Sequence, residues 1–247
     1  MDMLILPIVI IGLLTGMLIG TVGVGGVLLA PFLYYGLRID LHAATAMSSW
    51  SFLFTGIVGT MTYWRRDSIS WELVKWLSLG IIPGALVGAA ANSILPNDGL
   101  ILVLAVLILA SGANSLLSPP GTPREAAAFS RLTLLALGIL TGFGSALTGT
   151  GGPVILVPVL LLLKIPPLLA IAAGQAAQVP VSVFASLGNS LFGEIDLLLG
   201  SLLGLIQSLG VVVGANITHA IQPNQLRRIV AYALIGVGGG MIWRFVA

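Results

Sequence analysis

Charged side chains are scarce in this chain. Lys, Arg, Asp and Glu together make up 7% of its 247 residues, whereas 57% are apolar and the mean hydropathy is +1.11. Soluble domains carry about 25% charged residues. The composition therefore predicts an integral membrane protein surrounded by a lipid bilayer. The net charge of +2 is spread over so few groups that it indicates no nucleic-acid partner.

Cysteine is absent, which excludes disulfides, thiol nucleophiles and cysteine metal sites. The chain also lacks the HExxH and Gly-x-Ser-x-Gly motifs, and no P-loop lysine follows its glycines; these motifs would indicate a metalloprotease, a serine hydrolase or a nucleotide-binding enzyme. No charged residue lies clearly inside an apolar segment, which argues against a carboxylate-based proton pump. We therefore expect no enzymatic activity, no cofactor and no metal site.

Glycine, in contrast, is abundant and clustered in two places. Residues 20–26 read GTVGVGG inside an uncharged apolar run, and residues 147–152 read LTGTGG in an equally apolar setting. Seven of the fifteen positions 12–26 are identical to those 126 residues later: Gly12/Gly138, Leu14/Leu140, Thr15/Thr141, Gly16/Gly142, Gly23/Gly149, Gly25/Gly151 and Gly26/Gly152. The chain is thus predicted to be duplicated, with membrane repeats at 1–117 and 131–247 joined by a linker at 118–130.

Each glycine cluster lies in an apolar run that is too long for one crossing. Residues 3–35 would form a straight helix of about 50 Å, against a hydrocarbon core of about 30 Å. Because glycine weakens a helix, we expect both this run and 132–163 to be broken into two shorter helices. The remaining apolar runs each fit one transmembrane helix, and they cover 41–64, 71–91, 99–117, 168–192, 197–220 and 229–246.

The basic residues favour a broken run that turns back as a hairpin over one that crosses. With hairpins, eight of the ten basic residues fall on one side: Arg65, Arg66, Lys75, Arg124, Arg131, Lys164, Arg227 and Arg228, leaving Arg38 and Arg244. With crossings, the split is six to four. The positive-inside rule prefers the first arrangement. The predicted fold is therefore an all-α membrane protein with two inverted-topology repeats, each a glycine-broken hairpin plus three transmembrane helices, with both termini extracytoplasmic.

The two breaks are the first candidate binding site. A helix that begins at the membrane midplane exposes free N–H groups and its positive dipole end, so an anion can bind without a buried cation. The candidate residues are Thr21, Gly23, Gly25 and Gly26 in the first break and Thr148, Gly149, Thr150, Gly151 and Gly152 in the second. The competing interpretation is that these glycines only allow helices to pack closely.

A second candidate set lies one segment later in each repeat. Ser48 and Ser49 occupy places equivalent to Gln175 and Gln178, and the two glutamines share a helix face at i, i+3 spacing. Their amides can donate to one ligand, or they can join neighbouring helices by hydrogen bonds as structural glue.

The pattern TG-x6-GxGG occurs at 15–26 and at 141–152, each followed by a proline, Pro31 and Pro158. With the half-length repeat, this pattern resembles the sulfite exporter TauE/SafE family of membrane permeases over essentially the whole chain. The resemblance implies export of sulfite, sulfoacetate or a related organosulfonate across the bacterial cytoplasmic (inner) membrane. The substrate is then a small anion; the oligomeric state is left open, a homodimer included.

An ion channel is the alternative function. Residues 21–25 read TVGVG, close to the TVGYG filter of potassium channels. A filter needs four such loops around one axis, and this chain offers two copies, of which the second reads differently. We therefore favour a secondary transporter that works by alternating access.

Overall fold

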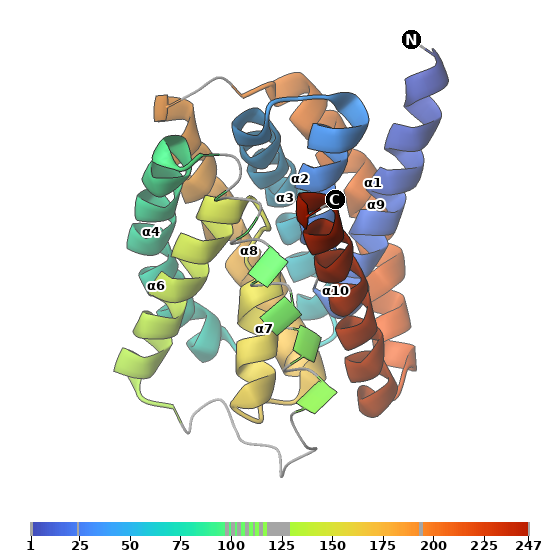
Figure 1. Ribbon diagram of the computed structural model, residues 1–247. Coiled ribbons are helices and arrows are strands. Elements are labelled where there is room, and N and C mark those ends of the chain that lie inside the picture. Colours follow the sequence, from blue (N-terminus) through green and yellow to red (C-terminus); the bar gives the residue numbers. More distant parts are fainter. Residues whose placement is uncertain are drawn as a thin grey trace.

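The computed structural model describes residues 2–23, 25–96, 129–192 and 195–246, with scattered residues between 99 and 117. All regular elements among these residues are helices (Figure 1). They are α1 Asp2–Val22, α2 Gly26–Pro31, the π-helix η1 Phe32–Gly36, α3 Leu41–Trp64, α4 Trp71–Ile94, α6 Arg131–Thr148, α7 Pro153–Leu162, α8 Pro167–Phe192, α9 Leu197–Ala220 and α10 Pro223–Val246. The predicted linker lies almost wholly outside the described residues, and the predicted span 99–117 is described only at scattered positions.

Helix boundaries follow local capping signals in the sequence. Asp40 precedes α3 and accepts hydrogen bonds from His42 N and Ala43 N, and Asp196 precedes α9 and accepts one from Leu199 N. Side-chain oxygens at this position satisfy N–H groups that a helix start leaves unpaired. The predicted helices 41–64 and 197–220 are confirmed with the same bounds. Helix α10 begins at Pro223, earlier than the predicted residue 229, because proline fits the first turn of a helix.

Both over-long apolar runs are broken, as predicted. The first break separates α1 from α2 and contains Gly23 at φ +77°, and the second separates α6 from α7 and contains Gly149, Gly151 and Gly152 at positive φ. The chain folds back at the first break, since a β-carbon built on Gly25 would lie 2.0 Å from Thr15 O of α1. In Figure 1, α2 returns toward the end where α1 enters, and α7 returns toward the end where α6 begins.

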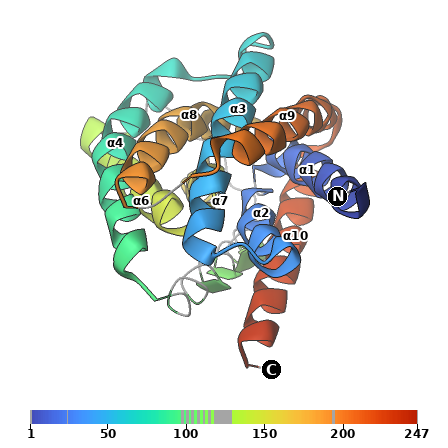
Figure 2. The ribbon, with the colours of Figure 1, turned by 90° about the horizontal axis from the view of Figure 1, so that it is seen from above.

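Two helix pairs pack through glycine at opposite sides of the bundle. α1 packs on α9 and α4 packs on α6, with α3 and α8 between the pairs (Figure 2). A β-carbon on Gly16 of α1 would lie 2.0 Å from Gln207 O, and one on Gly84 of α4 would lie 2.3 Å from Ile139 O. Glycine at four-residue spacing permits this backbone contact. Close packing of these helices thus uses Gly12, Gly16, Gly20, Gly138 and Gly142.

Four helices among the described residues are long and apolar enough to cross a membrane: Trp71–Ile94, Arg131–Thr148, Pro167–Leu191 and Leu197–Ala220. The segments Leu6–Val22 and Gly26–Gly36 are shorter apolar helices. The set includes α6, which the sequence analysis assigns to a hairpin. It leaves out α3, whose many buried Ser and Thr side chains lower its hydropathy. A multi-helix membrane protein follows from these lengths and compositions.

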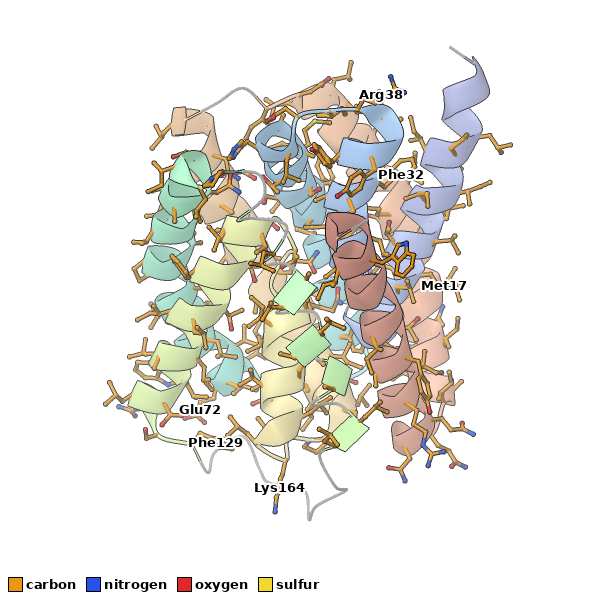
Figure 3. All side chains as sticks on the ribbon, in the orientation of Figure 1. Met17, Phe32, Arg38, Glu72, Phe129 and Lys164 are labelled. Carbon is orange, nitrogen blue, oxygen red and sulfur yellow. The ribbon has the colours of Figure 1, made fainter. Side chains whose placement is uncertain are left out.

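Charged groups mark the two ends of the bundle. Lys164 and Glu72 lie at one end and Arg38 lies at the other (Figure 3). Arg131 begins α6 at the end marked by Lys164, and its guanidinium lies 5.0 Å from the ring centre of Trp76 in the first turns of α4. We call the end that carries Lys164 and Arg131 the basic end, and the opposite end the Arg38 end.

Candidate functional site

The two glycine breaks meet in the interior of the bundle. A β-carbon built on Gly26 would lie 2.2 Å from Thr150 O, and one on Gly23 would lie 3.0 Å from Val157 Cγ2 of α7. Gly151 faces Phe52 of α3 at 2.6 Å in the same construction. The absence of side chains at these positions allows the close contacts. The two predicted glycine clusters therefore lie together inside the bundle.

Helix starts adjoin this meeting point. α2 begins at Gly26 after Gly25, and α7 begins at Pro153 after Gly152. Neither start has a side-chain cap. The N-terminus of α7 thus presents its positive dipole end beside the first break. Pro153 has no N–H group, and Ile155 N and Leu156 N donate to Gly152 O, so the dipole is the main attraction that this helix start offers to an anion. Such an arrangement attracts anions.

The threonines of the candidate site differ in their position and in their hydrogen-bond partners. Thr150 lies in the second break, 3% exposed, and its hydroxyl oxygen is 3.0 Å from that of Thr148, which donates to Gly144 O. Thr21 was expected in the first break and is not there. It belongs to the last turn of α1, and its hydroxyl donates to Met17 O at 2.6 Å. Thr21 is therefore occupied within its own helix in this structure.

The polar residues of α3 and α8 mostly bond to the backbone. Ser48 and Ser49 donate to Ala44 O and Thr45 O within α3. Gln175 Nε2 donates to Ile19 O of α1 at 2.7 Å, and Gln178 Nε2 lies 2.9 Å from Phe52 O and also close to Thr55 Oγ1. These bonds are of the kind that the alternative interpretation, hydrogen bonding between neighbouring helices, predicts. The glutamine donors join α8 to α1 and α3, although Gln175 Oε1 has no partner.

No buried side chain among the described residues carries a formal charge: the buried polar groups are Ser, Thr, Asn and Gln. An anion at the breaks would therefore interact with peptide dipoles and neutral donors.

Comparison with known proteins decides the family. The family model named Sulfite exporter TauE/SafE matches residues 8–241. The chain belongs to the sulfite exporter TauE/SafE family. It is thus a multi-pass membrane transporter, set in a lipid bilayer and acting on a transported substrate.

Similar proteins carry compatible names over their whole length. The probable membrane transporter protein YjnA of Bacillus subtilis (strain 168) is 25% identical over 94% of this chain and 97% of its own. The probable membrane transporter protein MJ0441 of Methanocaldococcus jannaschii is 26% identical over 96% of this chain and 95% of its own. YunE of B. subtilis, another probable membrane transporter protein, is 20% identical, with 96% of both chains covered. No solved structure matches.

In this TauE/SafE family member, the sequence analysis missed the residues that bind the carbonyl ends of the broken helices. Asn92 Nδ2 donates to Leu147 O at the end of α6 at 2.7 Å. At the end of α1, Thr218 Oγ1 lies 2.8 Å from Thr21 O, and Tyr63 OH donates to Gly20 O at 2.7 Å. Asn92 and Thr218 are 126 residues apart, so the repeat register was the signal that relates them.

A histidine lies beside each of these groups: His42 is within hydrogen-bond distance of Asn92, and the ring of His219 lies 5.2 Å from that of Tyr63. His42 Nδ1 lies 3.3 Å from Asn92 Oδ1, and His219 Nε2 lies 3.2 Å from Ser68 Oγ. In the TauE/SafE fold these histidines adjoin the residues that hold the broken helices, which ties the breaks to both ends of the bundle.

Proposed function

We propose that this protein is a secondary transporter that exports a small sulfur-containing anion, such as sulfite, sulfoacetate or another organosulfonate, by alternating access. The observation that carries the proposal is the contact between the two breaks, where Gly26 meets Thr150 O beside the uncapped start of α7. Peptide N–H groups suit a sulfonate, which has three acceptor oxygens. The absence of charge among the described buried side chains suits a site that must also release its anion.

In this proposal the two halves, 1–117 and 131–247, are inverted-topology repeats. Corresponding elements pack reciprocally: α1 of the first half lies on α9 of the second, and α6 of the second lies on α4 of the first. Arg38 and Lys164, which are 126 residues apart, both have positive φ, at 56° and 66°. They lie at opposite ends of the bundle (Figure 3). Equivalent loops at opposite ends are what an inverted repeat produces.

The orientation follows from charge. The breaks would form re-entrant hairpins, and the basic end would face the cytoplasm. Both termini would then be extracytoplasmic. The substrate site is proposed at Gly23, Gly25, Gly26, Gly149, Gly151 and Gly152, with Thr21, Thr148, Thr150, Ser48, Ser49, Gln175 and Gln178 around it. Thr150 would have to turn its hydroxyl proton from Thr148 Oγ1 to the ligand. Several of these side chains now donate to backbone carbonyls, and the conformational change of alternating access would have to break those hydrogen bonds before they could bind a ligand.

A channel filter has less support. Thr21 and Val22 are helical residues of α1, and the carbonyls of Gly20 and Thr21 accept from Tyr63 and lie near Thr218. A filter needs an extended run of carbonyls that face a pore. Val24, the fourth residue of the motif, lies outside the described residues.

The proposed function is tested by uptake of labelled sulfite, sulfoacetate and taurine into proteoliposomes, with and without a pH gradient. We expect saturable uptake of at least one sulfur-containing anion. Empty vesicles and the same protein with labelled chloride provide the controls. Intact protein that moves none of these anions under any gradient would refute the proposed substrate class.

A further inference from the structure

Helix α8 carries a line of buried polar side chains along one face. Gln175, Gln178, Ser182, Ser186 and Asn189 recur at intervals of three or four residues, so they share one side of the helix. Each is at most 6% exposed. The face turns toward α3 at its first two members: Gln178 bonds to Phe52 O, and a β-carbon on Gly59 would meet Gln175 Oε1.

Beyond Gln178, three polar atoms of this face have no hydrogen-bond partner. Ser182 Oγ, Ser186 Oγ and Asn189 Nδ2 are buried and make no hydrogen bond. Serines in helices usually donate to a preceding carbonyl, as Ser48 and Ser208 do here. Buried donors are normally paired, so three unpaired donors on one helix face indicate a place for a ligand or ordered water.

The corresponding face of α3, all of whose residues the structure describes, has no unpaired side-chain donor. At the 126-residue offset that relates the starts of α3 and α8, the three donors correspond to Gly56, Thr60 and Tyr63. Thr60 donates to Gly56 O, and Tyr63 donates to Gly20 O. The unpaired donors thus belong to one half of the molecule, although the repeat predicts the same helix in both.

The line of donors leads from the breaks toward the Arg38 end. α8 starts near Lys164 at the basic end and runs to the opposite end of the bundle (Figures 1 and 3). Eleven residues separate Gln178 from Asn189, which corresponds to about 16 Å along the helix. Gln178 itself lies against the second break, because a β-carbon on Gly152 would be 3.8 Å from Gln178 Cα.

We propose that Ser182, Ser186 and Asn189 form a second anion subsite between the breaks and the Arg38 end, and that the anion passes through it on the outer half of its route. The subsite takes an oxyanion or sulfonate, because the unpaired groups available are hydroxyl and amide donors. It rests on the proposed function, since it supplies the exit from the site at the breaks. In this structure the three side chains of the subsite are buried, at most 6% exposed.

Single cysteines test the subsite cleanly because the chain has none of its own. We would make Ser182→Cys, Ser186→Cys and Asn189→Cys, with Ala177→Cys as a buried control on the other face of α8. Each variant is first checked for a monodisperse elution profile. Ser182→Cys replaces one oxygen by sulfur and is the variant least able to disturb folding.

The measurement is the labelling rate with a membrane-impermeant methanethiosulfonate that carries a sulfonate, applied to either side of membrane vesicles. A sealed core position such as Ala177 reacts only through local opening, so we expect the three subsite thiols to react at least about tenfold faster than the Ala177→Cys thiol. Labelling should be faster from the Arg38 side and slower in the presence of excess sulfoacetate, relative to chloride at equal ionic strength.

Two results would overturn the subsite. Labelling no faster than at Ala177→Cys would mean that this face of α8 is sealed, and fast labelling without protection by sulfoacetate would mean a water-filled crevice that binds no anion. Neither readout uses transport. A failure of anion uptake by the wild-type protein is therefore a separate result, which bears on the proposed function itself.

Discussion

At Gly26 one added methyl group would push the two breaks apart, because its missing side chain lets the first break touch Thr150 O of the second. The backbone has positive φ at Gly23, Gly149, Gly151 and Gly152, a conformation that other residues adopt at a cost of about 1–2 kcal/mol. The sequence pattern identified all of these positions. It did not predict that Thr21 belongs to a helix, because the end of α1 depends on carbonyl partners from distant segments, Tyr63 and Thr218.

We predict that Gly26→Ala impairs both folding stability and transport. The new β-carbon would lie 2.2 Å from Thr150 O, and relieving such overpacking costs about 1–3 kcal/mol. The unfolding midpoint in detergent should fall and anion uptake should drop. Gly239→Ala is the matched control, because its β-carbon meets nothing within 4 Å and alanine favours the helix. Equal behaviour of the two variants would contradict the contact between the breaks.

At the scale of elements, each broken helix is held at its carbonyl end by the helix on which it packs. Asn92 of α4 does this for α6 and Thr218 of α9 does it for α1. Periodicity and length predicted the helices and their breaks, since the bounds of α3 and α9 agree with the apolar runs. They could not predict these bonds, because a single sequence does not reveal which polar side chain faces which helix end.

Thr218→Val is predicted to lower the free energy of unfolding by about 1 kcal/mol, since it keeps the shape of the side chain and removes its hydroxyl. The end of α1 should become more mobile, and backbone amide exchange at residues 20–23 should rise. Thr62→Val is a control, as Thr62 donates only to Val58 O of its own helix. An unchanged exchange pattern at the end of α1 would show that Thr218 does not hold it.

For the whole molecule, the two halves exchange their packing partners, so that neither half forms the bundle alone. A duplication is predicted from the sequence through the glycine identities at a 126-residue offset. The sequence does not predict that donors on α8 stay unpaired while those on α3 are paired. This difference depends on which hydroxyl groups find carbonyl partners after packing.

The membrane orientation is predicted from charge and can be read from two single cysteines at equivalent exposed loops. Arg38→Cys should react with an impermeant maleimide from outside intact cells, and Lys164→Cys should react only after the membrane is opened. Reversal of this pattern would invert the orientation and assign the basic end to the exterior.

Counterflow is the measurement that tests the central claim most directly. Proteoliposomes preloaded with excess unlabelled sulfoacetate are diluted into a trace of labelled sulfoacetate with no ion gradient imposed, and sulfite is tested in the same way. A carrier with one site that alternates between the two faces predicts a transient accumulation of label above equilibrium, abolished in Gly26→Ala. Simple equilibration without an overshoot would indicate a channel, and the absence of any exchange by intact protein would contradict the account.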